Sequence, residues 1–295
     1  MNLNSLPIVS VLSDHVTIVQ KDDVKIVRVQ HPKAEAGISL FGGHVVSFKP
    51  QDQEDVIWMS QQAVFDGKTA LRGGIPVCWP WFGRIATPAH GFARSTQWTL
   101  VEHKENEQGV MIRLGMKPSE ASLAIWPHQF EALLDIEISD TLNVSLKVKN
   151  TDTIEWAFSG ALHSYFNIAD ILYTEITGMG DHYLDSLKDG KVSLGGETLT
   201  FSSGVDRVYT HPKSEIKISD PKNHRFITVE NQGSNAAVIW NPWELASSMA
   251  DMEDDGYQTM VCVESTLHAP SIEEGKVLQP QESYTLSTKI GVIAS

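Results

Sequence analysis

The sequence has little cysteine and no long apolar run. Cys78 and Cys262 are the only cysteines in 295 residues, too few for the disulfide framework of small secreted domains. No stretch reaches the roughly 18 apolar residues of a membrane-spanning helix, and residues 1–15 lack the basic and apolar segments of a signal peptide. We therefore expect reduced, buried cysteines in a cytoplasmic protein that does not contact membranes.

Basic residues are also scarce. Lys and Arg number 23 against 37 Asp and Glu, which gives a formal net charge of −14. Such a surface repels nucleic acid and anionic membranes at long range, so neither is an expected partner. A small anion could still bind, but it would need a local cluster of Arg or Lys whose nearby charges outweigh the screened distant ones.

Several catalytic and cofactor motifs are missing. The eleven histidines show no HxH or HExxH spacing, so no metal site is expected. The absence of GxSxG excludes the nucleophile elbow of a hydrolase. The absence of GxGxxG and of a Walker loop excludes the common nucleotide-binding turns.

What the sequence does have is apolar alternation with a period of two, which is typical of half-buried strands. Polar turn residues separate the strands, and long amphipathic helices are missing; the helical candidates are short, at 241–252 and 266–275. This pattern predicts one mainly β domain, a sandwich or barrel, over residues 1–295. The expected strands include residues 25–30, 37–41, 45–48, 109–115, 131–140, 143–150, 226–231, 236–241, 259–265 and 283–292.

One expected strand, residues 153–168, carries a histidine on a face of small side chains. Alternation puts Ser159 and Ala161 on the face of His163, and Ser164 on the opposite face. Small side chains leave room above a sheet, and here that room would end at an imidazole. The alternative is a hydrogen-bonded core histidine with no chemical role.

Two carboxylates are candidate functional groups. Glu264 ends the apolar stretch 260–264, where it is either an exposed strand-end residue or a buried one. A buried Glu beside a His would form a matched acid–base pair, because burial raises the pKa of a carboxyl group. The sequence does not show that His163 and Glu264 meet. Asp206 precedes Arg207, so the alternative for it is a surface salt pair.

A stiff loop rich in Gly, Pro and Trp carries cations in this acidic chain. Residues 71–95 include Arg72, Arg84 and Arg94, together with His90. These arginines either bind an anion or pair with carboxylates. Further along, Trp240 and Trp243 flank an Asn-Pro turn; aromatic faces of this kind stack on sugars or fill cores.

Six segments in order resemble the aldose 1-epimerase superfamily, and within it the hexose-6-phosphate mutarotase branch. The resemblance covers about residues 35–290 and implies a β-supersandwich of the galactose-mutarotase type with a few short helices. It also implies interconversion of the α and β anomers of a hexose 6-phosphate without a cofactor, with D-glucose 6-phosphate as the expected substrate. The matching segments are 71–83, 90–95, 159–168, 205–209, 238–243 and 260–266.

The resemblance also assigns roles to the candidate residues. His163 falls on the position of the acid–base histidine, and Glu264 on that of the general base. Asp206 falls on the carboxylate that holds sugar hydroxyls, and Arg72 and Arg94 on arginines that would bind the 6-phosphate through their planar forks.

Two further positions are expected to contact the substrate. His90 matches a substrate-contacting histidine of the wider superfamily, and Trp243 is the expected aromatic contact to the sugar. Ala89 stands where some members carry Gln, which puts one substrate contact in doubt, and His44 stands where a Gln or small polar residue is expected.

Two other functions are also compatible with the sequence. A non-catalytic sugar-phosphate sensor on the same fold would keep the arginines and tryptophans without needing both His163 and Glu264. A carbohydrate-binding β-sandwich would bind hexose and hexose 6-phosphate equally. The expected partner is a small sugar phosphate, and we expect a monomer or weak dimer.

Overall fold

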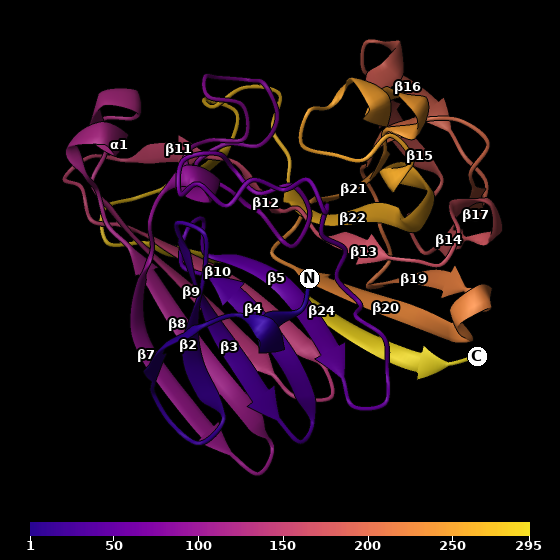
Figure 1. The fold of residues 1–295 in the computed structure, drawn as a ribbon. Coiled ribbons are helices and arrows are strands. Elements are labelled where there is room, and N and C mark those ends of the chain that lie inside the picture. The colour runs from indigo at the N-terminus through magenta and orange to yellow at the C-terminus, as the bar shows by residue number, and fades with distance from the viewer.

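The alternating segments form antiparallel sheets in the computed structural model, which describes residues 1–295 (Figure 1). The first 50 residues make a five-stranded sheet in the order β1-β2-β3-β4-β5. Its strands are β1 Ile8–Val11, β2 Val16–Lys21, β3 Val24–His31, β4 Ala34–Ser39 and β5 His44–Pro50.

The largest sheet has nine strands and combines the middle of the chain with its C-terminal end. In spatial order they are β17 Thr198–Thr200, β14 Glu175–Thr177, β19 Glu215–Asp220, β20 Arg225–Gln232, β24 Ser283–Ala294, β10 Leu142–Asn150, β9 Phe130–Ile138, β8 Gly109–Met116 and β7 Thr99–Asn106.

An eight-stranded sheet carries the segments in which the candidate residues lie. Its order is β16 Lys191–Leu194, β15 His182–Asp185, β18 Val205–Tyr209, β21 Ala236–Asn241, β22 Met260–Leu267, β12 Gly160–Leu162 and β6 Val77–Cys78, with β13 Tyr165–Asn167 also paired to β22. A small sheet pairs β11 Trp156–Phe158 with β23 Lys276–Leu278.

Helical structure is limited to short turns and one short α-helix. The expected helix at 241–252 is a 3-10 turn, η6 Trp243–Ser248, and the one expected at 266–275 is wrong, since that segment continues β22 and then becomes irregular. The α-helix, α1 Glu120–Ile125, begins at a capping box between Ser119 and Ser122. The other 3-10 turns are η1 Leu3–Ser5, η2 Ala93–Ser95, η3 Ile171–Tyr173, η4 Ser186–Lys188, η5 Pro221–Asn223 and η7 Gly256–Thr259. All of these helices fall short of the length and apolar character that a membrane span requires.

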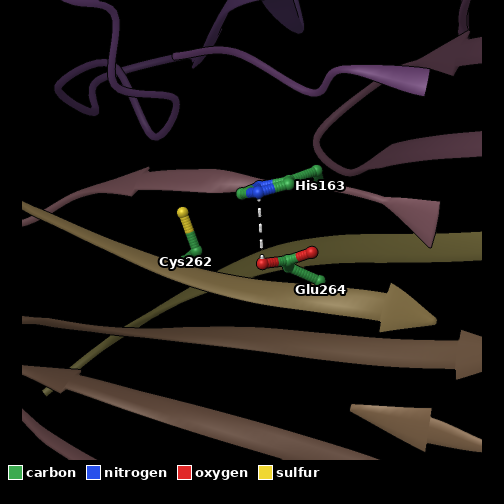
Figure 2. A group of neighbouring side chains, drawn as sticks. All are labelled: His163, Cys262 and Glu264. Atoms are coloured by element: carbon green, nitrogen blue, oxygen red, sulfur yellow. Dashed lines mark ion pairs between the residues drawn. The ribbon is translucent and has the colours of Figure 1, made fainter. Parts of the chain in front are cut away.

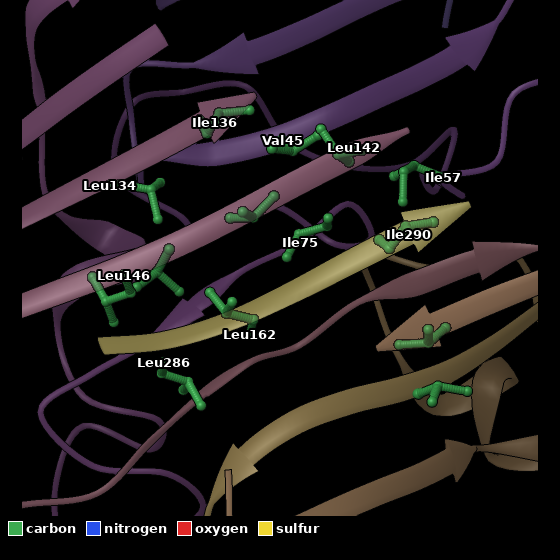
Figure 3. Packing of buried hydrophobic residues seen from close by; sticks show 14 of the residues in the cluster. Val45, Ile57, Ile75, Leu134, Ile136, Leu142, Leu146, Leu162, Leu286 and Ile290 are labelled. Carbon is green, nitrogen blue, oxygen red and sulfur yellow. The ribbon is translucent and has the colours of Figure 1, made fainter. Parts of the chain in front are cut away.

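The core lies between the nine-stranded sheet and the other two large sheets. Strand β3 contacts β8, and β22 contacts β24 and β20. Figure 3 shows side chains of β9, β10 and β24 meeting others from β5, β12 and the loops, and the labelled ones include Leu134, Leu146, Leu162 and Ile290. The apolar positions expected in 131–140, 143–150 and 283–292 are mostly on this buried face. Burial of apolar area at about 25 cal/mol per Å² is the main stabilising term.

Strand β22 is buried along its whole length because both of its faces are covered. Val261, Val263 and Leu267 belong to the main core. Met260 and Cys262 point to the other side, into a small cluster beneath the loop that precedes β22. Glu264 shares this second face by alternation, so the fold places a carboxylate in the middle of a buried strand.

Candidate active site

A cavity of about 330 Å³ opens on the second face of β22, within the range typical of small-molecule sites. Its wall combines strands of the eight-stranded sheet with the arginine-rich loop and the segment after β21. The lining residues are Arg72, Phe82, Arg84, Ala89, His90, Arg94, His163, Tyr165, Asp206, Val238, Trp240, Met249 and Glu264.

Strand register explains why His163 and Glu264 meet. Leu162 pairs with Ser265, and Tyr165 pairs with Cys262. The same count across the break between β12 and β13 puts His163 directly opposite Glu264. Directly opposed residues on antiparallel strands have their Cβ atoms about 5 Å apart, so the two side chains must interact.

Both members of this pair are buried. His163 Nε2 lies 3.4 Å from Glu264 Oε1, and the side chains are 11% and 1% exposed (Figure 2). Glu264 Oε2 and His163 Nδ1 have no hydrogen-bond partner in the protein. Buried polar atoms are nearly always paired, so these two atoms have hydrogen-bonding capacity that a bound molecule could satisfy. The exposed-Glu alternative is therefore wrong, because β22 continues three residues beyond Glu264 to Leu267.

Burial disfavours charge on both groups. It raises the pKa of Glu264 well above its ordinary value of 4.5, and the negative charge of Asp206 raises that pKa further. Burial lowers the pKa of His163 well below 6.5, and His90, Arg94 and Arg72 lower it further. Both shifts favour the neutral forms, so in the ligand-free protein they displace a proton shared by the pair from His163 toward Glu264.

Three guanidinium groups and a neutral histidine line the same cavity. Arg84 has no carboxylate partner, and Arg94 donates from Nη2 to the Ala89 carbonyl at 3.0 Å. Arg72 contacts Asp251 at 3.2 Å. Burial, followed by Arg94, Arg72 and Arg84, lowers the pKa of His90 to about 3. The resemblance implies phosphate binding by Arg72 and Arg94, and Arg84, the third arginine noted in the same loop, lines the cavity with them.

His90 is held so that it presents one nitrogen to the cavity. Its Nδ1 accepts a hydrogen bond from the Gly83 backbone N–H at 3.3 Å, which leaves the proton of the neutral ring on Nε2. The ring lies edge-on to Phe82 at 5.1 Å and to His163 at 5.7 Å. A neutral imidazole in this orientation can donate one hydrogen bond to a ligand.

The structure puts Trp240, and not Trp243, in the cavity wall. Trp240 lies in β21 opposite Asp206 and Cys262, on the same face as Glu264. Trp243 lies beyond the strand, where its ring packs on Tyr257 at 5.2 Å. Alternation along β21 could have distinguished the two tryptophans. The expected sugar contact of Trp243 has no geometric support, whereas Asp206 lines the cavity as expected.

His44 does not line the cavity but supports the backbone beside it. It is fully buried, and its Nε2 lies 2.6 Å from the carbonyl oxygen of Gly73. Burial lowers the pKa of His44 to about 4, so the ring is neutral and donates this hydrogen bond. His44 therefore fixes the backbone next to Arg72.

One group of side chains has donors close enough to hold a metal ion. The ligand atoms of His163, Cys262 and Glu264 lie within 4.8 Å of one another (Figure 2). Burial raises the pKa of Cys262 well above 9.0, so the thiol would have to lose its proton to bind a metal. A metal ion there would also bind the imidazole of His163 and the carboxylate of Glu264, the two groups of the acid–base pair.

The fold and the cavity together define a class. It is an antiparallel sandwich whose cavity brings together a buried Glu–His pair, a second carboxylate and three arginines. The sequence profile described as Aldose 1-epimerase matches residues 25–291, and the chain belongs to this family.

Individual relatives agree with this assignment. A Salmonella typhimurium protein that carries the provisional name glucose-6-phosphate 1-epimerase is 38% identical over 281 residues, 94% of each chain. An Escherichia coli protein with the same provisional name is 38% identical and covers 88% of this chain and 89% of its own.

Solved structures show the same fold. A Salmonella typhimurium protein described provisionally as a mutarotase superposes with a TM-score of 0.93 at 36% identity and covers 99% of this chain and 98% of its own. The galactose 1-epimerase of Lactobacillus acidophilus has a TM-score of 0.76 at 12% identity, with 97% and 100% covered. The expected galactose-mutarotase type of β-sandwich is confirmed.

Proposed function

We propose that this protein interconverts the α and β anomers of a hexose 6-phosphate, with D-glucose 6-phosphate as its substrate. The observation that carries the proposal is the buried His163–Glu264 pair in one cavity with Arg72, Arg84 and Arg94. The pair supplies proton transfer at C1, and the arginines supply bidentate donors for a phosphate. The names of the relatives point to the same substrate.

Anomer exchange needs a base at the C1 hydroxyl and an acid at the ring oxygen. Glu264 removes the hydroxyl proton while His163 protonates the ring oxygen, and the C1–O5 bond breaks to give the open-chain aldehyde. Rotation about C1–C2 and reversal of the two proton transfers close the ring as the other anomer. Each group typically contributes about 10²–10⁴-fold. The pair ends the cycle with the same single proton with which it began.

Phosphate binding would shift the shared proton from Glu264 to His163. Arg94 and Arg72 lower the pKa of His163 in the free protein. A dianionic phosphate between the guanidiniums offsets their charge, which raises the pKa of His163 and favours transfer of the proton from Glu264. Binding of the phosphorylated substrate would thus leave His163 protonated and Glu264 ionised, as the reaction requires.

The direct test is α/β exchange measured by NMR across free and phosphorylated hexoses. We expect exchange to be fastest with hexose 6-phosphates. Binding of the phosphosugar without accelerated exchange would instead identify a sensor. Equal rates for free and phosphorylated sugars would show that the protein does not recognise the phosphate group.

The pH profile should show a broad plateau and not a narrow maximum. The active pair holds one proton, which it loses as the pH rises above the raised pKa of Glu264. It gains a second proton only below the lowered pKa of His163. The two limbs should therefore lie farther apart than the ordinary values of 4.5 and 6.5 allow. The measurement is kcat/KM for exchange over about pH 4–10.

A free hexose serves as the control for this profile, because a phosphomonoester itself titrates near pH 6. Limbs that appear with both substrates belong to the protein. A sharp maximum between 4.5 and 6.5 with both would contradict the shifts that burial causes at this pair.

A further inference from the structure

Arg72 is held by protein groups on two of its sides. Its Nε donates to both carboxylate oxygens of Asp251, each at 3.2 Å, and its Nη1 donates to the Tyr165 hydroxyl at 3.1 Å. A guanidinium has five N–H groups. These contacts use one on Nε and one on Nη1, so the second N–H of Nη1 and both of Nη2 are left for the cavity that Arg72 lines.

The Tyr165 hydroxyl is a fixed point. The Tyr165 ring is 3% exposed and stacks on Trp58 at 5.9 Å and on His163 at 4.9 Å, with interplanar angles of 17° and 12°. Burial raises the pKa of Tyr165, so the hydroxyl stays neutral. Stacking on two rings fixes the Tyr165 side chain, so its hydroxyl is an acceptor in a fixed position for Arg72 Nη1.

Asp251 reaches Arg72 from the other side. It lies between η6 and η7, in a segment that a second acid also ties down: Glu253 accepts hydrogen bonds from the Ser60 hydroxyl at 3.0 Å and from the Gln61 backbone N–H. Asp251 does not line the cavity. Its carboxylate takes the Nε edge and leaves the terminal amino groups, which form the fork that matches a phosphate.

We infer that Asp251 and Tyr165 are positioning residues that orient Arg72 so that its terminal amino groups face the phosphate of the substrate. This inference rests on the proposed function. Both residues act through Arg72. Tyr165 also links the phosphate site to the acid–base pair, because its hydroxyl accepts a hydrogen bond from Arg72 Nη1 while its ring stacks on His163.

The main test compares Asp251→Asn with Glu253→Gln. Both changes remove one charge from the same segment, but only Asp251 contacts Arg72. For Asp251→Asn we expect KM for hexose 6-phosphate to rise about 5–30-fold with kcat little changed, since a contact equally strong in ground and transition states affects KM. The inhibition constant of inorganic phosphate should rise by the same factor. Free-hexose exchange, and all constants of Glu253→Gln, should stay near wild type.

Tyr165→Phe is the second variant. It keeps the ring that stacks on His163 and removes the oxygen that receives Arg72 Nη1. We expect a rise of about 3–10-fold in KM for the phosphorylated substrate, because a neutral acceptor is weaker than a carboxylate. An equal loss with free hexose would show that Tyr165 acts on His163 and not on Arg72, and would overturn its part of the proposal.

Tighter inhibition by phosphate in Asp251→Asn would overturn the inference, because it would show that Asp251 competes with phosphate for Arg72. Equal effects of Asp251→Asn and Glu253→Gln would also overturn it, because Asp251 would then only anchor its segment. The proposed function fails separately, if the wild-type protein neither prefers hexose 6-phosphate nor is inhibited by inorganic phosphate.

Discussion

Glu264→Gln and His163→Asn are each expected to slow α/β exchange of hexose 6-phosphate by at least about 10²-fold, the usual contribution of one acid–base group. Gln keeps the shape of Glu264 but cannot accept the hydroxyl proton. Asn keeps a hydrogen-bonding group at 163 but cannot become a cation. The measurement is NMR exchange at saturating substrate, with binding of inorganic phosphate showing that the cavity is intact.

Cys262→Ala is the matched control for this pair. Cys262 is buried on the same face of β22, two residues from Glu264, but the proposed proton transfers do not use it. We expect this variant to keep most of its activity. The double variant Glu264→Gln, His163→Asn should lose little more than either single one, since residues acting as a unit are not additive. Near-normal exchange in either single variant would refute the assignment.

The fold could be predicted because its signal is local. The alternation in 131–140, 143–150 and 283–292 corresponds to β9, β10 and β24, whose apolar residues face the core. The expected strand over 153–168 is instead broken into β11, β12 and β13. Alternation fixes which face a residue is on, but it does not fix where a strand bends.

The small side chains before His163 were interpreted only partly correctly. Above Ser159 the chain itself approaches, because the Ser159 hydroxyl accepts a hydrogen bond from the Phe82 backbone N–H. Neither Ser159 nor Ala161 lines the cavity. The open space begins only at His163. A pattern of small residues indicates close approach without saying whether backbone or ligand approaches.

The meeting of His163 with Glu264 depends on long-range strand register, which no local pattern contains. The same holds for the contact between Arg72 and Asp251, which are 179 positions apart. The acidic run around 251–255 offers several carboxylates, and only the fold selects one of them. The resemblance supplied candidate residues, whereas their distances and pKa shifts required the structure.

Arg94→Ala is expected to lower kcat/KM for hexose 6-phosphate by about 10–10²-fold, because a charge-assisted hydrogen bond contributes about 1.5–3 kcal/mol. Arg94 lines the cavity and makes no ion pair in the protein, so its remaining donors are available to the phosphate. Free-hexose exchange should change little. Arg94→Lys should recover only part of the loss, since an ammonium group cannot reproduce the planar fork.

The matched control is Arg113→Ala, which makes the same change in net charge on β8, where Arg113 pairs with Asp135 at 2.6 Å, outside the cavity. Added salt should weaken the phosphorylated substrate selectively in the wild type, and less so in Arg94→Ala. All rates are compared on the pH plateau, because Arg94 also lowers the pKa of His163. If Arg94→Ala slows free and phosphorylated hexoses by one common factor, Arg94 is a structural residue, and phosphate recognition must then be assigned to Arg72 and Arg84 alone or abandoned.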